Sequence, residues 1–177
     1  AWDALSESLG GGIVPVTYMN STAAIKAMCG KNGGIVCTSS NAAAVFRWAF
    51  ERGDNVFFLP DQHLGRNTGM KVGIPLEEMV VWNPFKPLGG LSVGQLRQAR
   101  VVLWQGHCAV HTRFKVSQIE EARRKYPNVI VVVHPECTRE VVEAADLDAS
   151  TEFIARTGKQ APPGSVLAIG TEVNQVS

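Results

Sequence analysis

Short apolar runs alternate with amphipathic stretches along almost the whole chain. Runs rich in β-branched residues predict strands, and stretches with a helical period that begin at Ser or Thr predict helices. The predicted strands are Ile13–Thr17, Ile35–Cys37, Val56–Leu59, Met79–Trp82, Val101–Trp104, Val129–Val133 and Val166–Ile169. The predicted helices are Ser21–Met28, Ala42–Arg52, Ser117–Lys125, Arg139–Ala145 and Thr151–Thr157. Gln62–Met70 is expected to form one or two helical turns, and Val93–Arg100 a short helix or turn.

Strands that alternate with helices indicate an α/β fold with parallel sheets and right-handed crossovers. The alternation of strands and helices starts again after Trp104, so we expect two small Rossmann-like units, each with a three-layer arrangement. Residues 1–12 show no clear period and are interpreted as a remnant of another element or a linker. The expected organisation is therefore 1–12, a first α/β unit over 13–104, and a second over 105–177.

Composition and charge narrow the class of protein. Hydrophobic residues make up 45% of the 177 residues and charged residues 19%, which is enough apolar material for a core. The net charge of +1 and the scattered basic residues argue against nucleic-acid binding. No apolar run is long enough for a membrane span, and no signal peptide is visible, so a cytoplasmic protein without membrane contact is expected. The four cysteines form no C-x-x-C pair, which excludes a self-contained zinc or ferredoxin-type motif.

Polar residues gather directly after the predicted strands. In an α/β fold, ligands bind beyond the carboxyl ends of the strands, near free amides at helix N-termini. The residues at these ends include Tyr18, Asn20, Ser39, Ser40, Asp61, His63, His107, Cys108, His111, His134, Glu136, Ser150 and Thr151. Hydroxyl residues before helices are most often caps and nothing more. Two such sites in one crevice would instead bind two anionic groups, and Tyr18 fits either a structural or a binding role.

His134 and Glu136 stand out because they flank Pro135 directly after a strand that reads as fully buried. Ionisable groups are costly there without partners, which favours a functional role. Cys108 lies near two histidines after another strand, whereas Cys29, Cys37 and Cys137 resemble ordinary buried thiols. The residues alone therefore predict an α/β enzyme that binds a small anion and uses His and Glu for acid–base chemistry.

Taken together, the motifs resemble the quinolinate synthase family in order and spacing. They are Pro15–Ser21 (PVTYMNS), Cys37–Ala42 (CTSSNA), Leu59–Asn67 (LPDQHLGRN), Trp104–His111 (WQGHCAVH), Val133–Cys137 (VHPEC), Ser150-Thr151 and Ile169–Glu172 (IGTE). The resemblance implies a piece of an enzyme with three similar α/β domains, of which this chain covers the second and third. Such enzymes are transferases of NAD biosynthesis that condense iminoaspartate with dihydroxyacetone phosphate and eliminate phosphate and water. The resemblance implies L-aspartate oxidase as the source of the iminoaspartate.

The resemblance also implies a central [4Fe–4S] cluster held by one cysteine from each domain, with an open iron that acts as a Lewis acid. Cys108 matches one of the three ligands, and His111 matches a histidine close to the cluster. Glu136, His134 and Tyr18 match catalytic residues, with Glu136 the main acid–base group. The residues that match substrate-binding positions are Tyr18, Asn20, Ser39, His134, Glu136, Ser150 and Thr151.

The other cluster ligands of the family have no counterpart among the cysteines here, so we expect the chain alone to be inactive.

Two other functions compete with this interpretation. A cluster-free α/β module that binds phosphate or dicarboxylates would use the same strand-end hydroxyls and leave Cys108 idle. A zinc hydrolase built on Cys108, His107, His111 or His134 is disfavoured because the ligands have no compact spacing.

Overall fold

The computed structural model of the chain describes residues 1–172. The chain divides into two compact units, one over Ala1–His107 and one that begins at Cys108. All strand pairs of the two described sheets are parallel, as the alternating pattern predicts. The α/β fold class with parallel sheets is therefore confirmed, and each unit is described here by itself.

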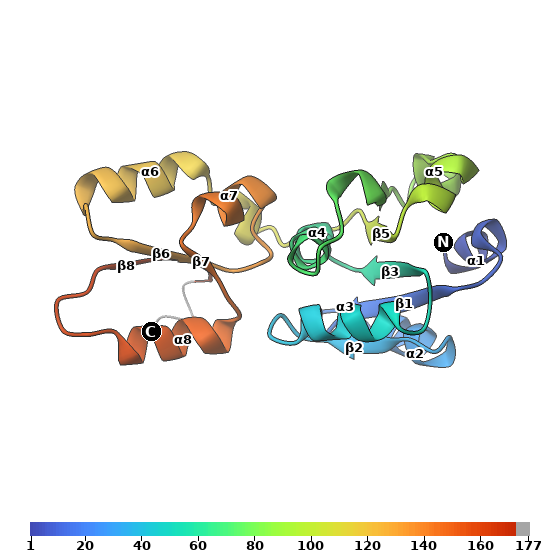
Figure 1. The fold of residues 1–177 in the computed structure, drawn as a ribbon, viewed down its shortest axis with the longest axis horizontal. Coiled ribbons are helices and arrows are strands. Elements are labelled where there is room, and N and C mark those ends of the chain that lie inside the picture. The colour runs from blue at the N-terminus through green and yellow to red at the C-terminus, as the bar shows by residue number, and fades with distance from the viewer. Residues whose placement is uncertain (173–177) are drawn as a thin grey trace. The chain divides into compact units, whose positions relative to one another are not determined.

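The first unit is built on a five-stranded sheet in the order β2-β1-β3-β5-β4 (Figure 1). Its strands are β1 (Ile13–Tyr18), β2 (Ile35–Cys37), β3 (Asn55–Leu59), β4 (Met79–Trp82) and β5 (Val101–Trp104). The chain moves from β1 to β2 on one side and then returns to β3 on the other side of β1. The carboxyl ends of β1 and β3 therefore flank the point where the strand order reverses, and α/β sheets commonly bind ligands at such a point.

Helices cover both faces of this sheet because successive strand residues point to opposite sides. They are α1 (Trp2–Leu9), α2 (Ala23–Lys31), α3 (Ala42–Phe50), α4 (Gln62–Lys71) and α5 (Val93–Gln98), with short 3₁₀ turns η1 (Leu76–Glu78) and η2 (Pro87–Gly90). On one face Phe58 packs with Phe46 of α3, and on the other Phe57 packs in a cluster with Leu5 of α1 and Leu96 of α5. Two separate hydrophobic clusters therefore stabilise the sheet from both sides.

The second unit holds a three-stranded sheet in the order β7-β6-β8. Its elements are η3 (His111–Arg113), α6 (Val116–Lys125), β6 (Ile130–Val133), α7 (Arg139–Ala144), β7 (Leu147–Asp148), α8 (Thr151–Gln160) and β8 (Leu167–Gly170). Val131 and Val133 of the central strand pack against Ile119 of α6 and Val141 of α7. Helix α8 lies on the opposite side of the sheet from α6 and α7 (Figure 1).

Several local predictions differ from the structure. Residues 1–12, which show no clear period, contain helix α1, whose Leu5 is buried and whose Trp2 and Leu9 pack against the same cluster. The two-residue strand β7 is absent from the prediction because Leu147 and Asp148 are too few to show a period. Helix α3 begins after Asn41, so neither Ser39 nor Ser40 is its N-cap.

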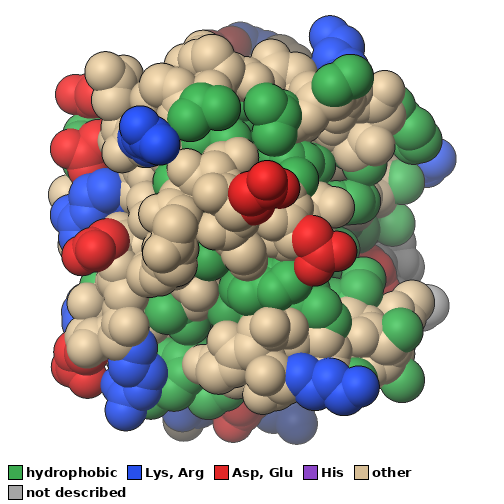
Figure 2. Space-filling model, turned by 90° about the vertical axis from the view of Figure 1, so that its right-hand side faces the viewer, with side chains coloured by type: hydrophobic (Ala, Val, Ile, Leu, Met, Phe, Trp, Pro, Cys, Tyr) green, Lys and Arg blue, Asp and Glu red, His purple; other side chains and the backbone are tan. Residues whose placement is uncertain are grey.

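The surface agrees with the charge distribution in the sequence. Figure 2 shows a face on which Lys and Arg side chains lie among Asp, Glu and hydrophobic side chains and form no continuous patch. None of the helices within residues 1–172 is long and apolar enough to cross a membrane.

Candidate functional site

The carboxyl edge of the second sheet gathers the ionisable residues that the sequence singles out. His134 follows β6 directly, and its backbone N–H donates to the carbonyl of Gly170 at the end of β8. On the other side of β6, the N–H of Ala149 donates to the carbonyl of Val133. These backbone bonds continue the parallel ladder beyond the strands. They hold the loops after all three strands of this unit at one edge.

Glu136 lies in the tight turn after β6, where the N–H of Cys137 donates to the carbonyl of His134. The carboxylate is buried, and its Oε2 lies 3.3 Å from Nδ1 of His134 and 3.5 Å from Nδ1 of His111. The backbone N–H of Glu136 also donates to Nδ1 of His134 at 3.3 Å. One carboxylate oxygen therefore faces two imidazole rings in a site with little access for water.

His111 reaches this carboxylate from the short turn η3. Its ring stacks on that of His134 with centroids 4.5 Å apart and planes 22° apart. Its Nε2 lies 3.3 Å from Oγ1 of Thr171, the residue that follows β8. Three segments far apart in the sequence therefore contribute to one buried polar group.

Burial favours the neutral form of both imidazoles. Loss of hydration, together with a smaller effect of the neighbouring His111, lowers the pKa of His134 to about 3. Loss of hydration also lowers the pKa of His111, although the negative charge of Glu172 acts in the opposite direction. A neutral imidazole offers one N–H donor and one bare nitrogen, so each ring can both accept and donate a proton.

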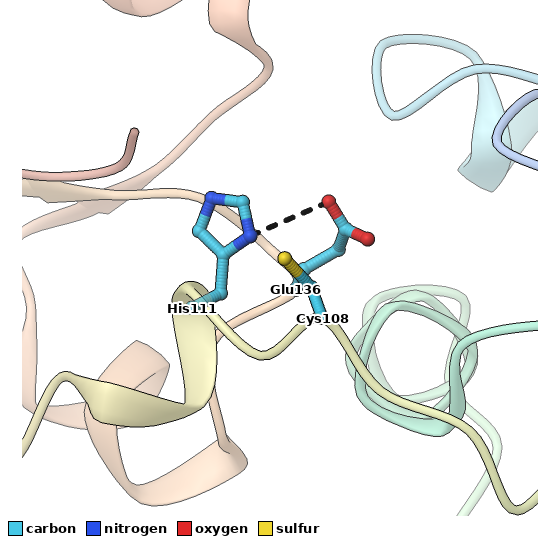
Figure 3. Close-up of side chains that lie close together, drawn as sticks. All are labelled: Cys108, His111 and Glu136. Atoms are coloured by element: carbon cyan, nitrogen blue, oxygen red, sulfur yellow. Dashed lines mark ion pairs between the residues drawn. The ribbon is translucent and has the colours of Figure 1, made fainter. Parts of the chain in front are cut away.

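Cys108 completes this group at the start of the second unit. Its sulfur, a ring nitrogen of His111 and a carboxylate oxygen of Glu136 lie within 4.8 Å of one another. Figure 3 shows the three side chains turned toward a common point, with the His111–Glu136 contact marked. We call Cys108, His111 and Glu136 the candidate metal centre, because thiolate, imidazole and carboxylate are all metal ligands.

The candidate metal centre fits one part of an iron–sulfur site. The partly exposed Cys108 presents a thiol from the loop that opens the second unit, and buried Nδ1 of His111 has no hydrogen-bond partner among the described residues. Cys108 is the only cysteine of the group within residues 1–172. A single thiolate cannot hold a cluster, so the remaining thiolates would come from segments other than those described.

The other cysteines do not contribute to this centre. Burial raises the pKa of Cys29 to about 11 and that of Cys37 to about 12, and both lie in the cores of the first unit. Cys137 is buried, and its thiol donates to the carbonyl of Gly170 at 3.8 Å. These thiols behave as core side chains, as the sequence predicts. His107 is exposed and lies outside the group of three.

Ser150 and Thr151 lie at the N-terminus of α8, directly after β7. The hydroxyl of Ser150 accepts the N–H of Phe153 at 3.4 Å and so caps the helix, as predicted. Both residues are half-buried, at the same edge of the sheet as His134. The first turn of a helix presents unpaired backbone N–H groups and the positive end of its dipole, which suits an anionic group.

The predicted site residues of the first unit lie at the carboxyl edge of β1 and β2. Tyr18 pairs with Cys37 in the strand register, and its ring is buried in the cluster on the α3 side. Asn20 is exposed just beyond β1, and Ser39 is half-buried in the turn before α3. The structure brings these three to one edge of their own unit. The expected roles of Tyr18, Asn20 and Ser39 in substrate binding stay predictions.

Sequence reasoning alone did not give Thr171 a role. The residue belongs to the IGTE motif, but a threonine after a strand is too common to attract attention. Its position after the last strand of a parallel sheet is the signal that could have placed it beside His111, because carboxyl ends of parallel strands meet at one edge.

Comparison with known proteins gives consistent matches over the chain. The family model described as Quinolinate synthetase A protein matches residues 3–177. Relatives named quinolinate synthase include those of Corynebacterium glutamicum, 56% identical over 99% of this chain, and Nocardioides sp., 55% identical over 99%. A further relative in Lysinibacillus sphaericus is 52% identical over the whole chain. The chain spans only 45%, 47% and 48% of these relatives' own lengths.

Proposed function

Because this chain belongs to the quinolinate synthetase A family, we propose that the protein carrying it condenses iminoaspartate with dihydroxyacetone phosphate to form quinolinate. The observation that supports this most strongly is the buried group in which Glu136 faces His111, His134 and Cys108. The reaction must remove and add protons at carbon and oxygen while phosphate and water leave. A carboxylate between two neutral imidazoles is suited to that task.

We further propose that Cys108 is one of three cysteine ligands of a [4Fe–4S] cluster. When bound, such a cluster with one open iron supplies Lewis-acid chemistry toward a hydroxyl or carboxylate of the substrate. The unpartnered Nδ1 of His111 among the described residues and the nearby thiol of Cys108 support a metal group here. The other two thiolates would come from outside the described residues, so the chain alone is expected to hold no cluster and to be inactive.

The remaining residues have proposed roles in substrate binding. Glu136 takes and returns protons at its carboxylate oxygen, and His134 binds substrate and assists this transfer. Both substrates are anionic, since iminoaspartate carries two carboxylates and dihydroxyacetone phosphate carries a phosphate. Ser150 and Thr151, at the start of α8, suit one anionic group, and Tyr18, Asn20 and Ser39 offer hydroxyl and amide groups for another. We place the enzyme in the cytoplasm, with L-aspartate oxidase as the source of iminoaspartate.

The experiment that tests this function uses the full-length protein under anaerobic conditions. It is supplied with iminoaspartate and dihydroxyacetone phosphate, and quinolinate and inorganic phosphate are measured together. Equal amounts of both products are expected, and the Cys108→Ser variant should form neither. If the wild-type protein forms no quinolinate, the proposed function is wrong. If Cys108→Ser keeps full activity, the function needs no cluster at Cys108, and a cluster-free anion-binding module becomes the better account.

A further inference from the structure

The loop that leads from β5 to Cys108 is anchored in the first unit by backbone hydrogen bonds. The N–H of Gln105 donates to the carbonyl of Trp82 at 3.0 Å and continues the ladder between β4 and β5. The N–H of Gly106 donates to the carbonyl of Trp104 at 2.8 Å, which closes a three-residue turn. The chain therefore leaves the sheet along a fixed path before it reaches Cys108.

A third hydrogen bond connects the same loop to the start of helix α4. The carbonyl of Gly106 accepts the N–H of Gln62, the first residue of α4, at 2.9 Å. This N–H is one of those that have no partner inside their own helix. The carboxylate of Asp61 accepts the N–H of Leu64, so the loop and the N-cap bind different donors of the first turn.

Gly106 lies against the backbone of Pro60, in a space that a side chain does not fit. A Cβ at position 106 would lie 2.2 Å from the carbonyl oxygen of Pro60 and 3.2 Å from Cδ1 of Trp104. Real Cβ atoms essentially never approach another heavy atom closer than 3.0 Å, so the contact with Pro60 would have to lengthen. The φ of Gly106 is not positive, so lack of space, and not backbone strain, excludes a side chain.

The required displacement is large on the scale of a metal site. Lengthening the contact with Pro60 from 2.2 Å to 3.0 Å moves the loop by about 0.8 Å. Distances between a metal and its ligand atoms are held to within about 0.2 Å. Only His107 lies between Gly106 and Cys108, so few backbone dihedrals are available to absorb the displacement before the thiol.

We propose that Gly106 is a positioning residue that fixes the point from which the chain leads to the thiol of Cys108. Its missing side chain lets the loop lie on the carbonyl of Pro60, and its own carbonyl holds the loop on α4. Gly106 acts only through the backbone that leads to Cys108. The effect on a cluster rests on the proposed function, whereas the anchoring of the loop rests on the geometry of the first unit.

The first test compares two substitutions at Gln62 in the iron-free full-length protein. Gln62→Pro replaces the N–H that binds the Gly106 carbonyl with a ring carbon, and helices accept proline at their first residue. The extended backbone of Asp61 also suits a following proline. Gln62→Ala removes the same side chain, including its contact with Arg66, but keeps the N–H, and is the matched control.

The measurement is the rate at which iodoacetamide alkylates Cys108, followed by mass spectrometry of the peptide that contains it. Cys108 is only partly exposed, so its alkylation depends on how often the loop opens. Loss of one backbone hydrogen bond, about 1 kcal/mol, should raise the rate about 5-fold in Gln62→Pro. Gln62→Ala should keep the wild-type rate, and equal rates in the two variants would overturn the proposal.

The second test compares Gly106→Ala with Gly53→Ala, a matched control at the opposite end of the same sheet. The Cβ added at position 53 would lie 2.3 Å from the carbonyl oxygen of Gly12, so both variants introduce a similar clash. Urea unfolding should show similar losses of stability. After anaerobic reconstitution, the affinity for iron in competition with a chelator should fall about 10–100-fold in Gly106→Ala, the usual range for residues that orient a metal ligand. Gly53→Ala should match the wild type.

Iron affinity in Gly106→Ala equal to that in Gly53→Ala would contradict the proposal. If Gly106→Ala does not fold, Gln62→Pro still decides, because it adds no atom at position 106. If the wild-type protein takes up no cluster but the alkylation rates differ as expected, the proposed function fails and the positioning of Cys108 by Gly106 stands.

Discussion

The two units place a buried carboxylate at the same point of the fold and use it in different ways. Asp61 follows β3 and Pro60 in the first unit, and Glu136 follows β6, His134 and Pro135 in the second. Oδ1 of Asp61 accepts the N–H of Leu64 at 2.8 Å and caps helix α4. Glu136 caps no helix, since α7 begins after Thr138. The same strand–proline–carboxylate arrangement thus stabilises a helix in one unit and faces two imidazoles in the other.

The comparison teaches that burial of a carboxylate after a strand does not by itself mark a catalytic group. Its partners decide the role. Backbone amides at a helix N-terminus stabilise the charged form and make the residue part of the fold. Neutral imidazoles instead provide alternative sites for a proton, which a reaction can use. Four changes would sharpen or break this contrast.

The largest effect is expected from Glu136→Gln. The change keeps the shape of the side chain but removes its ability to take a proton, so kcat for quinolinate formation should fall by about 10²–10⁴-fold, the usual range for loss of an acid–base group. Glu143→Gln, in an exposed ion pair with Arg139 on α7, is the matched control and should change activity very little. Comparable kcat values for the two variants would show that Glu136 carries no proton in the reaction.

A large effect of pH on stability is expected from the second unit. An unfolded histidine takes up a proton near pH 6.5, whereas folded His134 does so only near pH 3 because it is buried. The unfolded state therefore binds more protons between these values, and the free energy of unfolding should fall as the pH drops from about 6.5 toward 3. The loss is at most about 5 kcal/mol for this residue, from about 1.4 kcal/mol per pKa unit.

Urea unfolding at a series of pH values measures this loss. His134→Gln should flatten the dependence, while a change in the first unit such as His63→Gln should leave most of it in place. An equally steep loss of stability in His134→Gln would mean that His134 is not the residue that resists protonation.

A smaller effect, on the free energy of unfolding, is expected at Asp61, the carboxylate that caps α4. Asp61→Ala removes the cap of α4 and should lower the free energy of unfolding by about 1–2 kcal/mol. Asp61→Asn should recover most of it, because asparagine caps helices as well as aspartate does. Chemical denaturation checks both variants. If Asp61→Asn instead loses turnover by a factor similar to Glu136→Gln at normal stability, the contrast between the two carboxylates fails.

The smallest expected effect is the difference in stability between variants of Ser150 and Ser39, the hydroxyl residues before α8 and α3. Ser150→Ala removes the cap of α8 and should cost about 1 kcal/mol of stability, whereas Ser39→Ala should cost very little because Ser39 is not the N-cap of α3. Both should raise KM if they bind substrate. Unfolding curves and KM values for the two variants test this directly, and equal losses of stability would contradict the assignment of the caps.

The sequence predicts the layers and the strand ends well because these depend on local patterns. The strand predicted over the apolar run Val129–Val133 is found as β6 (Ile130–Val133), and the predicted strand Ile35–Cys37 is found as β2. The sequence does not predict helix α1 because its eight residues are too few to show a clear helical period. Strand β7 was missed because its two residues carry no pattern.

The sequence identifies single residues of the candidate site, but not the contacts between them. His134 and Glu136 attract attention because ionisable groups rarely follow a buried strand, and Cys108 because of its place in the motif. The contact of His111 with Glu136 and with Thr171 joins segments 25 and 60 residues apart, and no local pattern encodes such a distance. The family resemblance suggests what each residue does, whereas only the structure shows which residues His111 contacts.

The central claim, that the second unit carries the reactive centre through Cys108, is tested most directly by anaerobic reconstitution of the full-length protein with iron and sulfide. Visible absorption and bound iron are compared between the wild type, Cys108→Ser and Cys29→Ala, which removes a buried thiol of the first unit. The wild type and Cys29→Ala should develop the iron–thiolate band with matching iron content, and Cys108→Ser should not. An undiminished band in Cys108→Ser would contradict the claim.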